Sequence, residues 1–121
     1  MDPLEYIALA TELHHALEPD GDRQVILRTV VNRSYLGALM ATAAFLENVK
    51  GRNYPRDRGF YGAVEGDLVD ELPGFNDRLA TLRRYRADAD YDLGTDIPRA
   101  KAEHALRVAI SYTADLRSQF G

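Results

Sequence analysis

Apolar side chains recur every three or four positions along most of this chain, and no segment alternates apolar and polar residues as a strand would. Breaks rich in glycine, proline or acidic residues divide the pattern into five predicted helices, at about 2–17, 22–50, 63–71 and 75–87, with the last opening between 96 and 98 and ending near 119. Amphipathic helices bury their apolar faces against one another. The sequence therefore predicts an all-α protein, an up-and-down bundle of four to five helices.

Capping residues predict where several of these helices begin and end. Asp2 and Glu5 have the spacing of a capping box, and Pro3 suits the first helical position. Gly51 is expected to end the second helix, because glycine readily adopts the left-handed conformation there. The intervening turns and loops are predicted at 18–21, 51–62, 73–74 and 88–98.

The second predicted helix carries a stripe of small residues, Gly37, Ala41 and Ala44, at spacings of four and three. Small side chains allow the backbone of another helix to approach closely. Apolar residues also occupy more than one side of this helix. We therefore expect it to lie at the centre of the bundle.

Composition narrows the class of protein. The chain has 121 residues, 45% of them apolar, which suits one domain spanning 1–121. It has no cysteine, which excludes disulfides and cysteine-ligated zinc and fits a reducing compartment. No basic and apolar leader opens the sequence, and the longest uncharged run, 34–46, is shorter than the roughly 18 residues of a membrane-spanning helix. We expect a cytoplasmic protein that does not enter a membrane.

The charges are unevenly distributed. The net charge of −4 argues against a generally basic nucleic-acid binder, yet segments 50–58 and 78–86 hold eight of the fifteen cations. We therefore expect a local cationic face on a protein whose remaining surface is acidic. In the predicted loop, arginines interleave with aromatic residues, a pattern that suits contact with single-stranded RNA. The alternative is a solvated, mobile connection. The basic residues of this loop are Arg52, Arg56 and Arg58.

No motif identifies an enzyme or a metal site. The adjacent His14 and His15 point about 100° apart on a helix, so they do not readily ligate one metal. No phosphate-binding loop, HExxH motif or nucleophile elbow is present. We expect no metal and no cofactor, and a structural role for the histidines.

Two polar groups inside apolar surroundings carry more information. Arg33 falls within a helix among small and apolar residues, where an arginine is costly unless it is paired. Asp90 follows Arg86 by four positions and forms an intrahelical pair if the fourth helix continues that far. Alternatively, Asp90 accepts from Arg33 on the second helix. Either pair is a fixed element of helix packing or part of a ligand site, and the sequence leaves both open.

The residues around these groups resemble a known family. The segment NRSYLGALMATAAFLE, from Asn32, resembles the arginine–tyrosine helix of HEPN-domain proteins. The segment LRRYRADADY, from Leu82 to Tyr91, resembles the later family pattern leucine-arginine-x-x-arginine-x-x-alanine-aspartate-tyrosine. About fifty residues separate the two blocks, as in the family, and the resemblance covers roughly residues 25 to 115.

The resemblance implies a HEPN-like bundle that forms a homodimer. Many such proteins are metal-independent endoribonucleases of toxin–antitoxin or defence modules, paired with a minimal nucleotidyltransferase antitoxin. Their histidine acts in acid–base catalysis on RNA. Counting from Arg33, that histidine position is occupied here by Met40, and counting from Arg86 it is occupied by Tyr91. A thioether cannot transfer a proton, so Arg33 is the best catalytic candidate while the histidine is missing.

The resemblance therefore implies binding of RNA or nucleotide rather than a complete ribonuclease site. The alternative is a non-catalytic helical module that dimerises or docks on a partner protein through the small-residue stripe of the second helix. The residues that the resemblance and their polarity assign to ligand or RNA binding are Asn32, Arg33, Ser34, Tyr35, Arg83, Arg86, Asp90 and Tyr91.

Overall fold

The computed structural model describes residues 2–17 and 23–119, which form five helices and no strand, so the all-α prediction is confirmed. The turn predicted at 18–21, the helix start predicted at Asp22, and Phe120 lie outside the described residues. None of the helices in the described ranges is long and apolar enough to cross a membrane. The helices are α1 (Leu4–His15), α2 (Gln24–Lys50), α3 (Phe60–Glu71), α4 (Asn76–Tyr91) and α5 (Arg99–Ser118).

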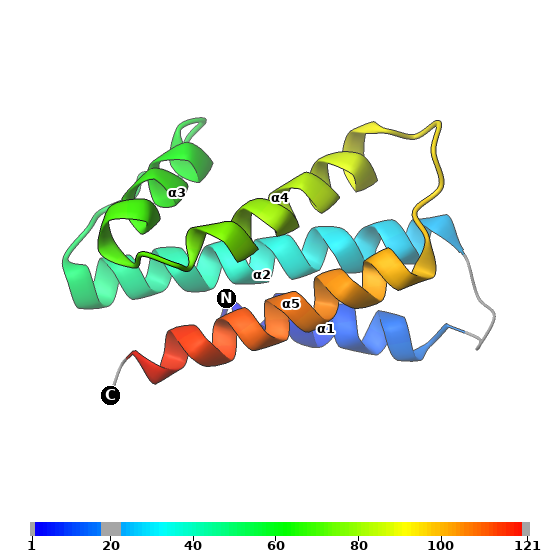
Figure 1. Ribbon diagram of the computed structural model, residues 1–121, viewed down its shortest axis with the longest axis horizontal. Helices are drawn as coiled ribbons and strands as arrows, with labels where there is room; N and C mark the ends of the chain where they lie inside the picture. The colour runs from blue at the N-terminus through cyan, green and yellow to red at the C-terminus, as the bar shows by residue number, and fades with distance from the viewer. Residues whose placement is uncertain (1, 18–22, 120–121) are drawn as a thin grey trace.

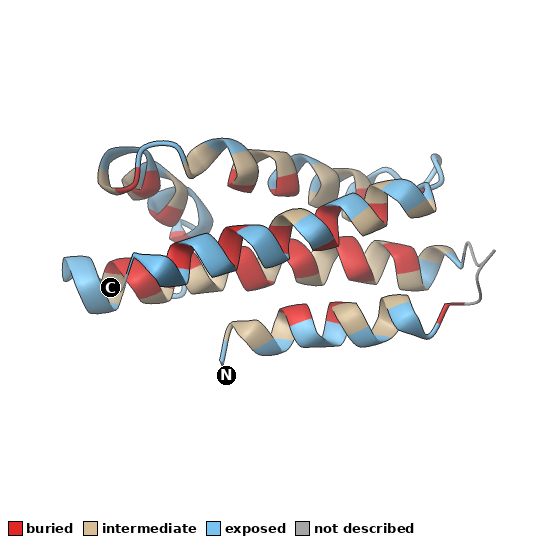
Figure 2. Ribbon diagram, turned by 60° about the horizontal axis from the view of Figure 1, so that its bottom comes forward, coloured by how far each residue is buried: buried red, intermediate tan, exposed pale blue. Residues whose placement is uncertain are grey.

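The longest helix, α2, is the centre of the bundle, as its apolar pattern predicts (Figure 1). It contacts each of the other four helices. Helices α1, α2, α4 and α5 alternate in direction, whereas α3 stands across the end of α2 and leads into α4. Buried positions recur along most of α2, because neighbours cover it on several sides (Figure 2).

Local capping determines several helix ends. Oδ1 of Asp2 accepts a hydrogen bond from the backbone N–H of Leu4 at 2.9 Å, which satisfies a donor that the helix itself leaves free. Gly51 ends α2 in the left-handed conformation, with φ of 72°, and the N–H of Arg52 then donates to the carbonyl of Leu46 at 3.0 Å. The break after α3 contains Gly74 at φ of 96°.

Two helix boundaries were predicted wrongly. The third helix was expected to begin at residue 63, but α3 begins at Phe60. Asp57 starts this turn, because its carboxylate accepts from the N–H of Gly59 at 2.9 Å and its carbonyl from the N–H of Phe60 at 3.1 Å. Burial of the Phe60 ring, which is 4% exposed, favours the extra turn. The fourth helix was expected to end at residue 87, but α4 continues to Tyr91.

The core joins α2 to every neighbour through large apolar side chains. Its largest members include Tyr35, Phe45 and Tyr112, each at most 2% exposed. The buried hydroxyls of Ser34 and Thr42 donate to carbonyls one turn earlier in α2, so neither is left without a partner. The hydroxyl of Tyr112 lies 2.6 Å from that of Thr42 and ties α5 to α2.

The small-residue stripe of α2 faces this chain's own helices. A Cβ placed on Gly37 would lie 2.6 Å from Cγ1 of Ile7, so α1 packs against α2 at a distance that only glycine permits. Ala41 and Ala44 line a hollow of about 210 Å³ with residues of the α1 start and of α5. The prediction of close helix approach is confirmed at Gly37, which α1 covers. Docking of a partner through this stripe stays a prediction, and it is confined to the half-buried Ala41 and Ala44 beside the hollow.

Candidate functional site

The two sequence blocks that resemble the HEPN pattern meet where α2, α3 and α4 come together. The hydroxyl of Tyr35 on α2 donates to Oε1 of Glu65 on α3 at 2.8 Å. Nη1 of Arg83 on α4 donates to the other carboxylate oxygen of Glu65. Glu65 therefore connects all three helices.

Arg86 lies among three tyrosine rings. Its guanidinium carbon is 5.7 Å from the ring centre of Tyr35, 5.5 Å from that of Tyr61 and 5.6 Å from that of Tyr91. These distances are within the range of cation–π attraction. Its Nε lies 2.8 Å from Oδ2 of Asp90 as an ion pair, although the buried Nε is not aligned for a hydrogen bond. Of the two partners that the sequence left open for Asp90, Arg86 is therefore the ion-pair partner.

Asn32 stands between Arg33 and Asp90, which corrects the expectation that Arg33 pairs with Asp90. Nδ2 of Asn32 donates to Oδ2 of Asp90 at 3.1 Å, and its Oδ1 accepts from Nη1 of Arg33 at 2.6 Å. The side-chain amide thus uses both of its ends. The result is a polar chain that runs Arg33, Asn32, Asp90, Arg86.

Arg33 lacks the carboxylate partner or the several backbone partners that the other half-buried arginines among the described residues have. In residues 2–17 and 23–119, each of the other half-buried arginines either has a carboxylate within ion-pair distance or donates to several backbone carbonyls. Arg33 is half-buried, has no such carboxylate among the described residues, and donates to the amide oxygen of Asn32. A guanidinium has five N–H donors, so most of the donors of Arg33 remain available.

Two hollows meet at Arg33. The first is small and polar, with a volume of about 140 Å³, and is lined by Arg28, Thr29, Asn32, Arg33 and Asp90. The second is a groove of about 340 Å³ between α1 and α2, lined by Glu5, Tyr6, Leu9, Arg33 and Leu36. The guanidinium therefore borders a polar pocket on one side and a mostly apolar groove on the other.

Two further residues from the second helix do not join this site. Ser34 was predicted to bind a ligand, but it is fully buried and its hydroxyl donates to the carbonyl of Val30 at 2.7 Å. Met40, at the family's histidine position, lines a separate hollow of about 480 Å³ together with Arg56, Arg58 and Tyr61.

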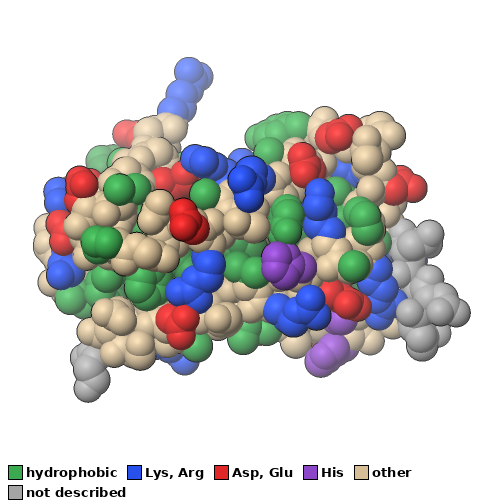
Figure 3. Space-filling model, viewed as in Figure 1, with side chains coloured by type: hydrophobic (Ala, Val, Ile, Leu, Met, Phe, Trp, Pro, Cys, Tyr) green, Lys and Arg blue, Asp and Glu red, His purple; other side chains and the backbone are tan. Residues whose placement is uncertain are grey.

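The basic loop is more neutral than its sequence suggests. Arg52 forms an ion pair with Glu71 at 2.7 Å, and Arg56 forms one with Glu47 at 3.1 Å. The hydrogen bond to Glu71 raises the pKa of Arg52. Basic and acidic side chains are interspersed over the face shown in Figure 3. The predicted cationic surface is therefore largely compensated at these two arginines, and Arg58 is the exposed arginine of the three that lacks a described carboxylate partner.

Two aromatic residues of the loop are also unsuited to stacking on bases. Tyr54 is 6% exposed and its hydroxyl donates to Oδ2 of Asp67 at 2.7 Å. Phe60 is buried beneath the guanidinium of Arg56, which lies 4.3 Å from the ring centre. Tyr54 and Phe60 are therefore held by contacts within the protein, whereas residues 51–53 and 55–59 are exposed, as expected of a solvated connection. Contact with RNA through this segment stays a prediction, for which Arg58 and the 37% exposed Tyr61 are the accessible residues.

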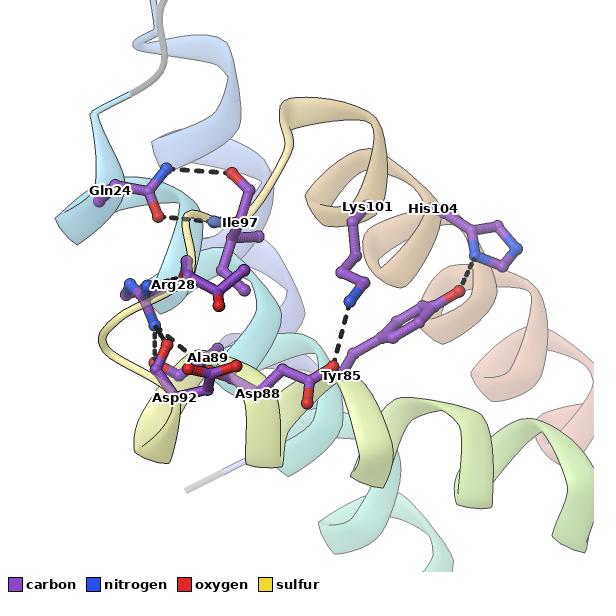
Figure 4. Close-up of polar contacts among 10 residues, drawn as sticks. Gln24, Arg28, Tyr85, Asp88, Ala89, Asp92, Ile97, Lys101 and His104 are labelled. Carbon is purple, nitrogen blue, oxygen red and sulfur yellow. Dashed lines mark hydrogen bonds and ion pairs between the residues drawn. The ribbon is translucent and has the colours of Figure 1, made fainter.

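Sequence reasoning missed Arg28, which supports the end of α4 (Figure 4). Its Nη1 donates to the carbonyls of Ala89 at 2.8 Å and Asp92 at 3.1 Å, and its Nη2 donates to the carbonyl of Thr95. These carbonyls have no partner within the helix, so Arg28 acts as a cap supplied by α2. Beside it, Gln24 exchanges two hydrogen bonds with the backbone of Ile97. No local signal predicts these contacts, because the partners are backbone atoms about sixty to seventy residues away.

The protonation chemistry of the site is limited. Burial and the hydrogen bond to Glu65 raise the pKa of Tyr35 far above its usual value, so its hydroxyl stays protonated at neutral pH. Two of the histidines lie elsewhere and have partners of their own. His14 forms an ion pair with Glu103 at 3.1 Å, and its hydrogen bond helps lower the pKa of that carboxyl. A ring nitrogen of His104 lies 2.8 Å from the hydroxyl of Tyr85 as a hydrogen bond. The described residues contain no cluster of three or more metal-ligating side chains. The arrangement can therefore bind an anion at Arg33, but the residues lining its two hollows include no histidine.

Comparisons of the chain with protein-family models, with curated proteins and with solved structures found no match.

Proposed function

We propose that this chain is a HEPN-like component of a toxin–antitoxin or defence module, and that it binds the phosphate of a nucleotide or RNA at Arg33. Support comes from the meeting of the two resembling sequence blocks in one polar cluster, where Asn32 links Arg33 to Asp90. The exposed ring of Tyr91 and the exposed side chain of Arg83 extend this surface.

The observation that carries the proposal is the half-buried guanidinium of Arg33, which has no carboxylate partner among the described residues. A partly desolvated cation gains most from an anion that also accepts several hydrogen bonds. Phosphate has this chemistry. The neighbouring Asp90 would repel a phosphate, but Arg86 neutralises it at 2.8 Å.

The proposed activity is binding rather than cleavage. Met40 cannot accept or donate a proton, and Tyr35 is held protonated by burial and by Glu65. A ribonuclease would need a proton-transfer group from elsewhere, such as a second protomer or another protein.

Calorimetric titration of the purified protein with nucleoside monophosphates and a short single-stranded RNA at low salt tests the proposal. We expect Arg33→Ala to weaken binding at least about tenfold, since a hydrogen bond to a charged group is worth about 1.5–3 kcal/mol. Arg107→Ala, which removes an exposed arginine of α5, is the charge-matched control and should bind like the wild type. Absence of binding, or equal weakening by both variants, would contradict the proposal.

A second candidate function is protein interaction, including the expected homodimer or a minimal nucleotidyltransferase partner. It is favoured by the hollow of about 480 Å³ beside Met40, where Tyr61 is also 37% exposed. Light scattering over a concentration series should show self-association that Met40→Glu reduces, since a charge would be buried in the contact. A strict monomer that also fails to retain a nucleotidyltransferase would argue against this function.

A further inference from the structure

We propose that the groove beside Arg33 takes the base of a guanine nucleotide, with Glu5 recognising the guanine and Arg33 holding the phosphate. This inference rests on the proposed binding of phosphate at Arg33 and adds which base the same site selects.

The first step is the relation between Glu5 and Arg33. Both line the groove of about 340 Å³ between α1 and α2. They do not form an ion pair with each other, and Arg33 donates to the amide oxygen of Asn32 instead. Two opposite charges that face one hollow without meeting leave room for a ligand between them. Such a ligand needs an anionic group at one end and hydrogen-bond donors at the other.

The second step is the shape of the space. Ligand pockets in proteins usually have volumes of about 300–1,000 Å³ and mostly apolar walls with a few placed polar groups. Besides Glu5 and Arg33, the groove is lined by Tyr6, Leu9 and Leu36, and Leu9 is 40% exposed. The adjoining polar pocket of about 140 Å³ also borders Arg33. A planar base therefore fits the apolar groove while its phosphate lies at the polar pocket.

The third step is the hydrogen-bonding pattern of the bases. An ionised carboxylate only accepts hydrogen bonds, and it accepts two parallel ones well. Guanine presents two adjacent donors, N1–H and the N2 amino group, on one edge. On the corresponding edges adenine and cytosine place an acceptor beside their amino donor, and uracil places acceptors on both sides of its single N–H. Only guanine can donate twice to Glu5 without directing a lone pair at it.

The test is calorimetric titration of the whole chain with GMP, AMP, CMP and UMP under the same low-salt conditions. GMP should bind about tenfold more tightly than the other three, because its additional charge-assisted hydrogen bond is lost with them. Glu5→Gln should remove most of this preference, since an amide offers one acceptor and one donor group. Glu12→Gln, at an exposed glutamate of the same helix, should leave the preference unchanged. Circular dichroism establishes that each variant retains its helices.

The outcomes separate this inference from the proposed function. Equal binding of all four nucleotides that still depends on Arg33 would overturn the guanine assignment and leave phosphate binding standing. A GMP preference that survives Glu5→Gln would likewise overturn the role of Glu5. Failure of every nucleotide to bind would overturn both. Loss of the preference in Glu5→Gln but not in Glu12→Gln, with Arg33→Ala weakening all four, is the result expected.

Discussion

Asn32 donates a hydrogen bond from Nδ2 to Oδ2 of Asp90 at 3.1 Å, and this contact joins the first third of α2 to the last turn of α4. The same amide accepts from Arg33 through Oδ1. Arg33 is thereby oriented without being neutralised. Asn32 therefore stabilises the contact between the helices, and the binding that we propose belongs to the adjacent Arg33.

We therefore expect substitutions of Asn32 and Arg33 to change the free energy of unfolding by different amounts. Asn32→Ala should lower the free energy of unfolding by about 1–2 kcal/mol, because Asp90 loses a hydrogen bond in a half-buried place. Arg33→Ala should change it by no more than about 0.5 kcal/mol, because Arg33 has no carboxylate to leave unpaired. Urea unfolding measures both. A larger loss from Arg33→Ala than from Asn32→Ala would show that Arg33 is chiefly structural.

The cap supplied by Arg28 should be needed for the end of α4. Arg28→Ala leaves the carbonyls of Ala89, Asp92 and Thr95 without this donor, and we expect a loss of about 2–3 kcal/mol. Arg28→Lys should recover only part of it, because an ammonium cannot reach carbonyls on both sides as a planar guanidinium does. Hydrogen exchange should show faster opening at the end of α4. Unchanged exchange there would be inconsistent with the cap.

The close contact between α1 and α2 gives opposite expectations for two glycines. Gly37→Ala places a Cβ 2.6 Å from Cγ1 of Ile7, a β-branched core side chain, so we expect a loss of about 1–3 kcal/mol despite the better helix propensity of alanine. Gly66→Ala on α3 meets no atom within 4 Å and should gain about 0.5–1 kcal/mol. Thermal unfolding compares the two. Stabilisation by Gly37→Ala would mean that α1 can move away from α2 at little cost.

Alkaline pH should destabilise the fold through Tyr112. Burial raises the pKa of Tyr112 to about 12, whereas an unfolded tyrosine titrates near 10. Between these two pKa values the unfolded state releases the proton and the folded state keeps it. The contribution of Tyr112 to stability is therefore full below pH of about 10 and is lost as pH rises toward 12. Tyr112→Phe should cost about 1 kcal/mol at pH 7, because Thr42 loses a partner, and should make the alkaline loss shallower. Urea unfolding between pH 7 and 11 measures the slope. Equal slopes for variant and wild type would rule out this contribution.

The paired arginines of the loop should act on stability rather than on ligand binding. Arg52→Ala removes contacts to Glu71 and Asp67, and because the side chain is 42% exposed and the ion pairs are screened by water, we expect only a small decrease in the free energy of unfolding. Nucleotide affinity should be unchanged in the titration described above. If Arg52→Ala weakened nucleotide binding as much as Arg33→Ala does, the loop would have to be part of the binding surface.

Much of the fold could be predicted from the sequence because helix periodicity and helix ends are local properties. The spacing of apolar residues indicated five helices, and Gly51 ended the second one as expected. The errors occurred where a distant partner changes a local preference. Burial of Phe60 starts α3 earlier than its glycines suggest, and Arg28 supports an α4 that continues past the polar segment at 88–91.

The candidate site was predictable as a set of residue types but not as a set of contacts. The sequence indicated that Arg86 and Asp90 could pair along one helix, and they do. The sequence also allowed Arg33 to pair with Asp90, and no local sequence feature could exclude that pairing. The rotation of α2 against α4 decided that Asn32 meets Asp90 and that Arg33 does not.

By itself the sequence determined which segments are helical, which faces are apolar and that α2 is central, since these follow from periodicity over a few turns. Only the tertiary structure decided which half-buried arginine lacks a carboxylate partner among the described residues. Arg86 pairs with a carboxylate, Arg28 donates to backbone carbonyls, and Arg33 donates to a side-chain amide. The reason is that a side chain's partner depends on the packing of helices some sixty residues apart, which no local pattern encodes.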